Sequence, residues 1–229
     1  MLSIVVPVLN EAQTIASTLT ALASFRQRGC EVIVVDGGSD DGTPGLAASL
    51  ASRVLTAPRG RAAQMNAGAA AARGDILIFL HADTRLPEGA DRRVQEALAQ
   101  SNRVWGRFDV RIEGRHPLLP LIAALMNARS RLSGIATGDQ AMFAGRQAFE
   151  AVGGFADIAL MEDIEMSRRL KALSPPLCLR DKVVTSGRRW ERRGVLRTIL
   201  TMWRLRLAYF CGAAPAGLAR RYGYAPREG

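Results

Sequence analysis

Two side chains that could bind a divalent cation, His81 and Asp83, directly follow a run of apolar residues at positions 76–80. Residues two apart on extended backbone point to the same side, and an imidazole nitrogen together with a carboxylate suits a metal ion. Ligands of open α/β sheets bind just beyond the carboxyl ends of strands, so this strand end is a candidate site. Taken alone, the spacing favours an ordinary polar exit from a strand, and other features of the chain must decide.

Two earlier apolar segments also end in polar side chains that could bind a ligand. Residues 4–8 are followed by Asn10 and Glu11, and residues 31–35 are followed by Asp36. One carboxylate after a strand is most often a helix cap, but three such ends in succession would be a rare accident. In a doubly wound sheet these ends can line a single crevice, where the Asp36 carboxylate could bind a ribose or a base.

Strand and helix alternate in the first half of the chain, which predicts the elements that position these groups. Besides the three strands, we expect helices over residues 12–25, from about Thr43, and over residues 61–72, with a short strand at residues 54–55. Near-continuous apolar strands between helices predict an α/β fold, with a mostly parallel sheet covered by helices on both faces. The glycines that follow Asp36 fit neither a dinucleotide-binding fingerprint nor a P-loop.

The second half of the chain is predicted to be more mixed. Its expected elements are an extended segment at residues 104–112, strands at 141–144 and 177–184, and helices at 117–132, 162–173 and 195–210. The tail after Pro215 is expected to be loosely ordered. Because no repeat or linker interrupts the sequence, we predict a single domain over residues 1–229. Its parts are a first half (1–115), a second half (116–190) and a basic C-terminal segment (191–229).

Arginine dominates the charge of the chain, because the formal net charge is +10 and only Lys171 and Lys182 are lysines. This balance favours anionic partners such as phosphates, nucleic acid or an acidic membrane, although base composition could equally explain it. No nucleic-acid-binding module is recognisable, so nucleic acid is not expected as a partner. The three cysteines have no spacing typical of disulfides or zinc, and neither a signal peptide nor a membrane-spanning run is found. We therefore expect a cytoplasmic protein, which could bind peripherally to the inner face of the membrane.

A basic, apolar helix near the C-terminus is the segment that could contact a membrane. Basic amphipathic helices with tryptophan bind anionic membrane interfaces. The apolar residues that recur at helical spacing here are Leu196, Ile199, Leu200, Trp203, Leu207 and Phe210. The alternative is that this helix packs on the core or on a second copy of the chain in a homodimer.

Several motifs, in this order and spacing, resemble the nucleotide-sugar-binding half of glycosyltransferase family 2, whose members have the GT-A fold. They lie at residues 6–11, 35–43 and 66–83 and continue through Gly153-Gly154-Phe155 and Glu162-Asp163, so that the resemblance covers roughly residues 2–190. The His-Ala-Asp version of the motif at residues 81–83 resembles a small bacterial subgroup. The resemblance implies a Rossmann-like, mostly parallel sheet of the GT-A type.

On the donor side, the resemblance implies a nucleotide-diphosphate sugar bound at the strand ends. Pro7, Asn10 and Glu11 would shape the base and ribose pocket. Asp36 would hydrogen-bond the base, which is often uracil, and Arg61 would approach the diphosphate.

The resemblance also implies a metal site at Asp83. This residue matches the last carboxylate of the family's D-x-D motif, which binds the metal that bridges the two phosphates. His81 stands where the first aspartate is expected, so the site has one fewer carboxylate. A cation that neutralises the departing diphosphate would stabilise the leaving group. Mn²⁺ or Mg²⁺ suits oxygen ligands, and a histidine shifts the preference toward Mn²⁺.

On the acceptor side, the resemblance implies that Asp163 is the general base of a single displacement with inversion. Acidic residues in a first helical turn are also a common structural feature, because they complement the helix dipole. The other acceptor-side or sugar-pocket residues implied are Asp139, Gly153, Gly154, Phe155 and Glu162.

Arg188-Arg189-Trp190 partly resembles the family's Q-x-x-R-W motif, but Ser186 replaces the glutamine. That motif belongs mainly to processive polymer synthases, so its incompleteness argues against processive synthesis. These residues could still clamp the diphosphate, and a solvated basic face is an equal alternative.

These observations predict a metal-dependent, inverting glycosyltransferase that moves one sugar from a nucleotide-diphosphate donor, of UDP type by preference, to a hydroxyl acceptor that could be lipid-linked. One alternative is a nucleotidyltransferase acting on sugar phosphates. Such chemistry usually needs a glycine-rich basic loop after the first strand, and this chain has an acidic one. A second alternative is a non-catalytic module that binds sugar nucleotides or a membrane surface.

Overall fold

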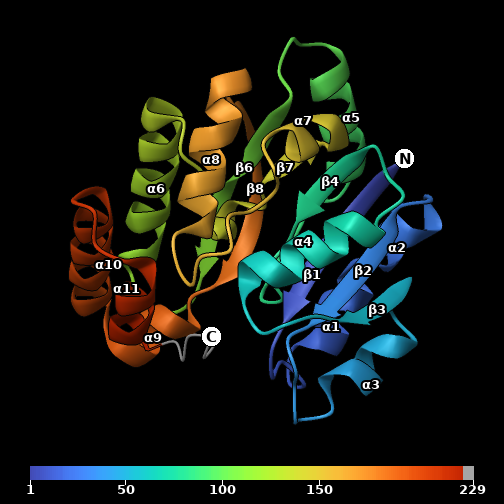
Figure 1. The fold of residues 1–229 in the computed structure, drawn as a ribbon. Coiled ribbons are helices and arrows are strands. Elements are labelled where there is room, and N and C mark those ends of the chain that lie inside the picture. Colours follow the sequence, from blue (N-terminus) through green and yellow to red (C-terminus); the bar gives the residue numbers. More distant parts are fainter. Residues whose placement is uncertain (224–229) are drawn as a thin grey trace.

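A sheet of eight strands forms the centre of residues 1–223, the part of the chain described by the computed structural model (Figure 1). The strand order is β3-β2-β1-β4-β7-β6-β8-β5. The strands are β1 (Leu2–Val8), β2 (Glu31–Asp36), β3 (Arg53–Thr56), β4 (Ile76–Phe79), β5 (Thr84–Arg85), β6 (Trp105–Glu113), β7 (Phe143–Gly145) and β8 (Leu177–Ser186). β1 pairs in parallel with both β2 and β4, so the order of strands reverses next to β1. In open α/β sheets this is where ligands bind.

Helices surround the sheet (Figure 1). They are α1 (Ile15–Ala21), α2 (Ala23–Gln27), α3 (Thr43–Ala48), α4 (Arg61–Ala71), α5 (Ala90–Ala99), α6 (Leu119–Ser133), α7 (Arg146–Ala151), α8 (Glu162–Leu173), α9 (Arg188–Arg193), α10 (Val195–Phe210) and α11 (Pro215–Tyr222), with a 3-10 turn, η1 (Gly138–Gln140).

Alternate residues of β1 enter two different cores, one on each face of the sheet. Ile4 and Val6 pack in the core that includes Ile15 of α1, whereas Val5 packs in the core that includes Met65 of α4. Successive side chains of a strand point to opposite faces, so a strand buried on both sides reads as a continuous apolar run. The predicted α/β fold, a mostly parallel sheet with helices on both faces, is confirmed.

The second half of the sheet mixes directions. β7 runs antiparallel to β4 and β6, whereas β6 and β8 pair in parallel. Charged residues inside β6 explain its mixed sequence pattern: Arg107 is fully buried and contacts Asp109, which also accepts a hydrogen bond of 2.7 Å from Arg131 of α6. Asn127 of α6 bonds to both the N–H and the C=O of Val110, at 2.9 and 3.0 Å. These contacts fix α6 against β6.

Two expectations about helices were wrong. The helix expected over residues 12–25 starts only at Ile15, because residues 11–14 make a turn in which the N–H groups of Thr14 and Ile15 bond to the Glu11 carbonyl. It is also divided at Leu22 into α1 and α2. The tail after Pro215 contains a helix, α11, which has proline in its first turn and ends at Gly223. One face of this helix is packed, because Leu218 and Tyr222 are buried against the segment that leads into α8. The rest of the tail prediction falls outside the described residues.

Three helices and one strand were not predicted: α5, α7, α9 and β5. All but α5 are at most six residues long, too short for a clear periodicity. Among residues 1–223, no helix has both the length and the apolar character needed to cross a membrane.

Candidate active site

A buried glutamine of α4 holds together the carboxyl ends of β1 and β2. Gln64 Nε2 donates to the carbonyl oxygens of Val8 and Val35, at 2.7 and 2.8 Å. The Gly37 N–H also bonds to the Val8 carbonyl, at 2.9 Å. A Cβ at Gly37 would lie 3.1 Å from the Gln64 side chain, so a larger residue there would press on this link. Sequence reasoning missed Gln64.

The loops after β1 and β2 have their polar groups satisfied by one another. The Asp36 carboxylate accepts hydrogen bonds from the N–H groups of Gly38 and Ser39, both at 2.9 Å, and from the Ser39 hydroxyl. Asn10 lies across from this turn, and its Oδ1 accepts from the Asp40 N–H at 3.0 Å. Pro7 lies within β1, opposite Val35. The predicted donor residues Pro7, Asn10 and Asp36 thus belong to one preformed edge.

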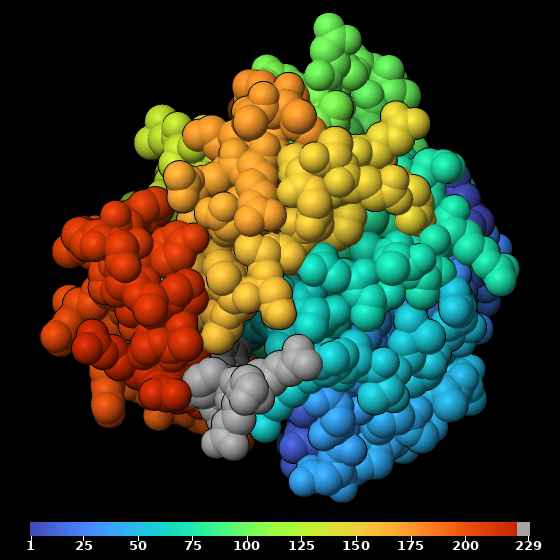
Figure 2. Space-filling model, in the orientation of Figure 1, coloured from blue at the N-terminus to red at the C-terminus, as the bar shows by residue number. Residues whose placement is uncertain are grey.

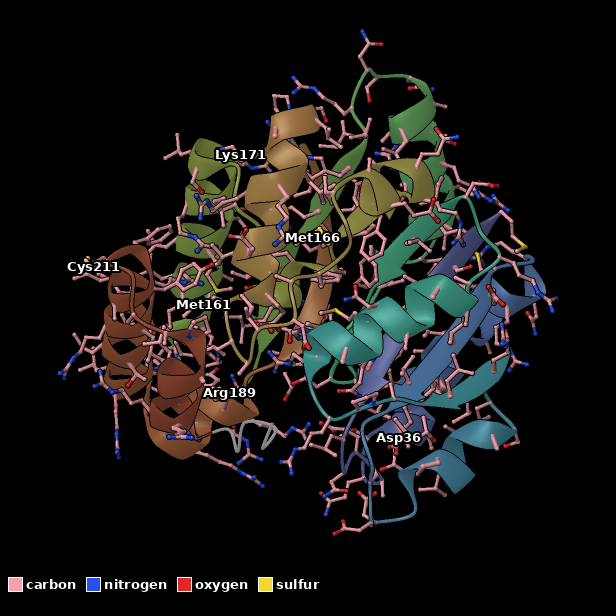
Figure 3. The ribbon with its side chains drawn as sticks, in the orientation of Figure 1. Asp36, Met161, Met166, Lys171, Arg189 and Cys211 are labelled. Atoms are coloured by element: carbon pink, nitrogen blue, oxygen red, sulfur yellow. The ribbon has the colours of Figure 1, made fainter. Side chains whose placement is uncertain are left out.

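Glu11 links this edge to the C-terminal segment. Its carboxylate accepts a 2.5 Å hydrogen bond from Thr14 and lies 3.9 Å from the Arg188 guanidinium of α9. The next two residues diverge, because Arg189 stacks on the Tyr222 ring at 4.9 Å and Trp190 packs against the core. In Figure 3 Arg189 lies by the C-terminal helices, to the left of Asp36. The predicted donor residues Pro7, Asn10 and Asp36 lie at the carboxyl ends of β1 and β2, and we call this part of the sheet the donor edge. Of the predicted diphosphate clamp, Arg188 is the residue that lies close to it.

His81 faces Asp139 of η1 rather than pairing with Asp83. His81 Nδ1 lies 3.4 Å from Asp139 Oδ1, and a Cβ at Gly138 would come within 2.3 Å of the imidazole ring. Only glycine therefore allows this close approach. Burial raises the pKa of Asp139, but hydrogen bonding to His81 and the charges of His81 and Arg61 outweigh it and lower that pKa to about 2.

Asp83 follows β4 as predicted, but the protein does not surround it with other metal ligands. In the described part of the chain its carboxylate has one hydrogen-bonding neighbour, the Thr84 hydroxyl at 3.5 Å. Residues 1–223 contain no cluster of three or more His, Cys, Asp or Glu side chains that could hold a metal ion. The donor set at this strand end is one half-buried carboxylate, with His81 engaged by Asp139.

The Glu162-Asp163 pair opens α8, as the sequence predicted, and connects two parts of the site. Asp163 Oδ2 accepts from the Gly138 N–H at 3.0 Å, next to the His81 contact. Glu162 is buried, and its carboxylate lies 3.7 Å from the Arg61 guanidinium at the start of α4. Burial and the neighbouring Asp163 raise the pKa of Glu162. The predicted donor residue Arg61 therefore contacts the acceptor-side pair.

Three non-glycine residues with left-handed backbone lie around these groups. They are Asn10 after β1 (φ 55°), Ala141 after η1 (φ 44°) and Met161 directly before Glu162 (φ 72°; labelled in Figure 3). Such conformations cost of order 1–3 kcal/mol each and persist where the surrounding structure enforces them, which is common at functional sites. In residues 1–223 they are the non-glycine positions of positive φ, so local strain concentrates around the candidate site.

The predicted acceptor loop, Gly153-Gly154-Phe155, is tied to α4. Both glycines are left-handed, and the Asn66 side chain bonds to the N–H and the C=O of Phe155, at 2.9 and 2.8 Å. The Phe155 ring lies in the core, 4.8 Å from the Phe79 ring in a T-shaped contact. The Phe155 ring therefore anchors this loop in the core. Gly153 is exposed, whereas Gly154 is buried against Asn66 and Phe149.

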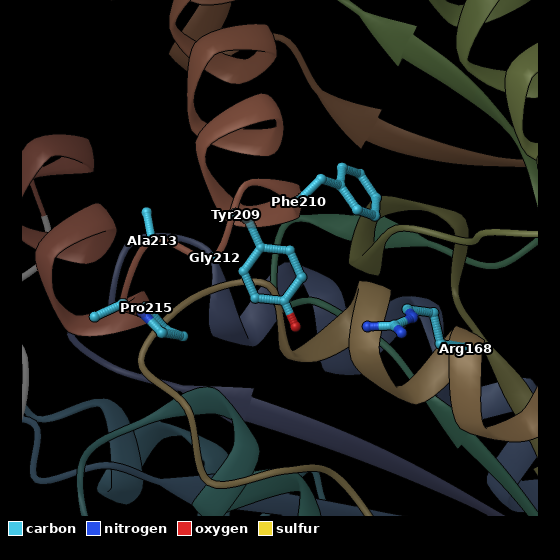
Figure 4. A pocket seen from close by; sticks show the side chains of 7 residues that line it. Arg168, Tyr209, Phe210, Gly212, Ala213 and Pro215 are labelled. Atoms are coloured by element: carbon cyan, nitrogen blue, oxygen red, sulfur yellow. The ribbon is translucent and has the colours of Figure 1, made fainter.

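The candidate site lies where three parts of the chain meet. In Figure 2 the C-terminal helices, the segment leading into α8 and α4 adjoin one another on the face in view. A separate hollow of about 490 Å³ lies between α8, the end of α10 and the start of α11, next to Arg168, Tyr209 and Pro215 (Figure 4). None of the residues that line this hollow was predicted for the site.

The profile of the family described as "Glycosyl transferase family 2" matches residues 3–153. The chain belongs to glycosyl transferase family 2. Residues 3–153 contain the edges after β1, β2 and β4, so family 2 accounts for the donor side of the site. Membership in this family supports glycosyl transfer over the nucleotidyl transfer that the sequence left open.

A curated relative is the undecaprenyl-phosphate 4-deoxy-4-formamido-L-arabinose transferase of Aeromonas hydrophila, 32% identical over 117 residues. The match covers 46% of this chain and 36% of the relative, so this family-2 member spans only about a third of that protein.

Solved structures share the GT-A fold with this family-2 chain. Residues 1–349 of S. aureus TarS with UDP-GlcNAc superpose with a TM-score of 0.64 and 16% identity, over 81% of this chain and 58% of that one. The mannosyltransferase PcManGT of Pyrobaculum calidifontis, with GDP-Man and Mn²⁺, gives a TM-score of 0.62 and 21% identity, over 90% of this chain and 60% of that one. At these identities the likeness shows the fold alone.

Proposed function

We propose that this glycosyltransferase moves a single sugar from a nucleotide-diphosphate donor to an acceptor hydroxyl, with inversion. The observation that supports the proposal is the contact between Arg61 and Glu162, 3.7 Å apart, since it joins a residue proposed to bind the donor to one proposed for the acceptor side. Transfer in one step requires the base, the acceptor and the departing diphosphate to meet in one place. The structural neighbours with UDP-GlcNAc and GDP-Man support a nucleotide-sugar donor.

In this proposal the donor binds along the edge formed by β1, β2 and β4. Asn10 and Asp36 would contact the nucleoside, as the resemblance implies, and UDP remains the preferred donor type. Arg61 and Arg188 carry positive charge to either side of this edge, where both already face carboxylates, Glu162 and Glu11. Binding of a diphosphate would exchange these long ion pairs for charge-assisted hydrogen bonds.

A divalent cation fits this site if it arrives with the donor. Mg²⁺ in proteins is usually bound by one or two carboxylates together with substrate phosphates, and Asp83 offers one half-buried carboxylate. The PcManGT structure with Mn²⁺ supports a metal in the family. When bound, the cation would neutralise charge on the leaving diphosphate. Because His81 contacts Asp139, the case for Mn²⁺ over Mg²⁺ that rests on imidazole ligation is weak.

Asp163 would take the proton of the acceptor hydroxyl. Its carboxylate is held by the N–H groups of Gly138 and Ile164, at 3.0 and 2.8 Å, so its position is set by the backbone of η1 and α8. Each carboxylate oxygen keeps a further lone pair for the acceptor. The hydroxyl could belong to a lipid-linked acceptor, which the name of the Aeromonas relative supports.

The test combines donor binding with sugar transfer. Thermal shift with UDP- and GDP-sugars, each with Mg²⁺ or Mn²⁺, should reveal a donor that raises Tm, and a chelator should abolish most of the shift. With that donor, Asp83→Ala should weaken metal-dependent binding, whereas Asp163→Asn should keep binding and lose transfer. Donor binding and transfer that proceed unchanged in both variants would refute the assignment of both residues.

A further inference from the structure

Two arginines beside the candidate base have buried N–H groups without partners. Nε and Nη2 of Arg129, on α6, and Nε of Arg206, on α10, are closed to solvent and make no hydrogen bond within residues 1–223. In the same residues, neither guanidinium lies within ion-pairing distance of a carboxylate, whereas Arg28, Arg107 and Arg131 do. Buried hydrogen-bond donors in native proteins are nearly always paired, so these unpaired N–H groups need an explanation.

The two arginines lie on different helices, and both helices contact segments that flank Asp163. α10 packs through Leu205 onto Met161, which directly precedes the Glu162-Asp163 pair. α6 is tied to η1, because Gln140 donates to Asn127 at 3.4 Å. Each side chain therefore comes from a helix anchored next to an element that positions Asp163.

The charges of the two side chains act on one another and on Asp163. Burial and, to a smaller extent, the charge of Arg206 lower the pKa of Arg129 to about 10, although the charge of Asp163 opposes the change. Burial also lowers the pKa of Arg206, and here Asp163 and Asp139 oppose the change. Two like charges held close together with unpaired donors are costly, and an anion between them would offset both costs.

We propose that Arg129 and Arg206 form a binding site for a phosphate group carried by the acceptor, next to the hydroxyl that receives the sugar. Planar guanidinium groups suit this role, because each can donate two parallel hydrogen bonds to a phosphate. The identity of the phosphate as part of the acceptor rests on the proposed function, whereas the presence of an anion site does not. The diphosphate of the donor could present the same chemistry, and the experiment separates the two sources.

The experiment measures binding of inorganic phosphate by calorimetry to the full chain, with and without UDP or GDP. Arg129→Gln and Arg206→Gln should each weaken phosphate binding at least about tenfold, the loss of a charge-assisted pair. Arg92→Gln is the control, because Arg92 is exposed on α5 and should leave binding unchanged. Equal binding in all variants, or none to the wild type, would overturn the proposal.

Displacement of phosphate by UDP or GDP would also overturn it, because the arginines would then belong to the donor site. If the wild type binds no nucleotide and phosphate binding still falls in the two variants, the proposed function fails while the anion site stands. A stability measurement separates binding from structure. Arg129→Met should raise the Tm of the ligand-free protein by about 2–4 °C, because it removes an unpaired buried charge. A lower Tm would show that Arg129 serves the fold instead.

A second inference comes from a different face of α10. Five apolar side chains on this helix are between 62% and 72% exposed. They are Leu196, Leu200, Trp203, Leu207 and Phe210, and they recur every three or four residues, so they form one stripe. The opposite face is buried through Val195, Thr198 and Leu205. The alternative that this stripe packs on the core holds only for the half-buried Ile199.

Arginines and a neighbouring helix extend this surface. Arg197 and Arg204 of α10 are exposed beside the stripe. α6 adds a shorter run of exposed leucines at positions 121, 125 and 132, and the two helices share one core cluster. We infer that this surface binds an anionic lipid bilayer: the leucines and the tryptophan enter the interface, and the arginines meet the lipid head groups.

Co-sedimentation with vesicles of phosphatidylcholine, with and without phosphatidylglycerol, tests this surface. The wild type should bind the anionic vesicles and lose most binding at high salt. Leu200→Glu with Leu207→Glu should abolish binding without unfolding the protein, because both positions are exposed. Leu46→Glu, at an exposed leucine of α3, is the control. The proposal would be overturned if the wild type is a dimer that does not bind vesicles and the double variant is a monomer. The surface would then bind a second copy of the chain.

Discussion

At the donor edge the protein completes the hydrogen bonds of its own buried polar groups, whereas beside Asp163 it leaves several unmet. Gln64 donates to carbonyl groups at the ends of β1 and β2, and the Asp36 carboxylate accepts from the turn that follows β2. Arg129 and Arg206 keep buried N–H groups without partners in residues 1–223. An unmet buried group costs about 1–3 kcal/mol, so the two sides differ in how much stability a ligand can restore.

This difference indicates which side is preformed. Because the polar groups of the donor edge are already hydrogen-bonded, a ligand adds only its own contacts, and the edge keeps its shape without a ligand. A side with unpaired charges and left-handed residues such as Met161 is held in place by the surrounding fold and relaxes when its ligand binds. Substitutions at the donor edge should therefore mainly lower stability, whereas substitutions on the acceptor side should mainly lower activity.

The largest expected effect is on activity, at the acceptor side. Asp163→Asn keeps the shape of the side chain but removes the base, so the rate of sugar transfer should fall by about 10²–10⁴-fold with donor binding unchanged. Initial rates and thermal shift with the donor measure the two quantities. Asp157→Asn, in the exposed loop before α8, is the control and should retain full activity. A parallel loss of donor binding in Asp163→Asn would erase the distinction between the two sides.

The second effect is on stability, at the donor edge. Gln64→Met should lower the free energy of unfolding by about 1–3 kcal/mol, because the carbonyls of Val8 and Val35 lose a buried donor. This is opposite in sign to the stabilisation expected for Arg129→Met. Urea unfolding measures both, and Gln95→Met, on the exposed side of α5, should change it by less than about 0.5 kcal/mol. If Gln64→Met were neutral, the donor edge would not depend on its internal hydrogen bonds.

The donor edge was also the part that the sequence predicted best. Its strands are buried on both faces, so their apolar runs mark the strands and the next polar residue marks the edge, as at Asp36 and His81. Gln64 was missed, although a signal exists: it lies four residues before Gly68, whose Cβ would come 2.3 Å from Val5, so both face the sheet. A polar residue among small residues on the sheet-facing side of a helix predicts a side chain that hydrogen-bonds to the backbone of the strands.

The acceptor side could be predicted only in part. The start of α8 at Glu162 was predicted correctly, because acidic residues followed by a helical apolar pattern mark a helix start. The approach of Arg206 to Arg129 was not, since it depends on how α10 packs across the molecule. Phe155 shows the same limit: its ring packs with Phe79 and Phe149, residues distant in sequence. The motif identified the loop but not the direction of the side chain.

A smaller effect is expected where the two sides touch, at His81. Gly138→Ala would place a Cβ within 2.3 Å of the imidazole ring, so the ring must move away from Asp139. Displacement of a group beside the donor edge should reduce kcat/KM about tenfold to a hundredfold, since small misplacements carry such costs. Gly45→Ala, in α3 with open space around it, is the control and should leave kcat/KM unchanged. Unchanged kinetics in Gly138→Ala would separate His81 from the reaction.

The smallest effect concerns the pH dependence of the same contact. The pKa of Asp139 is lowered from 3.8 to about 2, so its carboxylate binds protons less readily in the folded chain than in the unfolded chain. The stability that this contributes is present above about pH 4 and is lost as the pH falls toward 2. Asp139→Asn should therefore be less stable than the wild type at pH 5 and equally stable at pH 2, as measured by urea unfolding across this range. A difference that stays constant from pH 5 to pH 2 would mean that His81 and Asp139 are not coupled, and that the donor and acceptor sides meet only at Arg61 and Glu162.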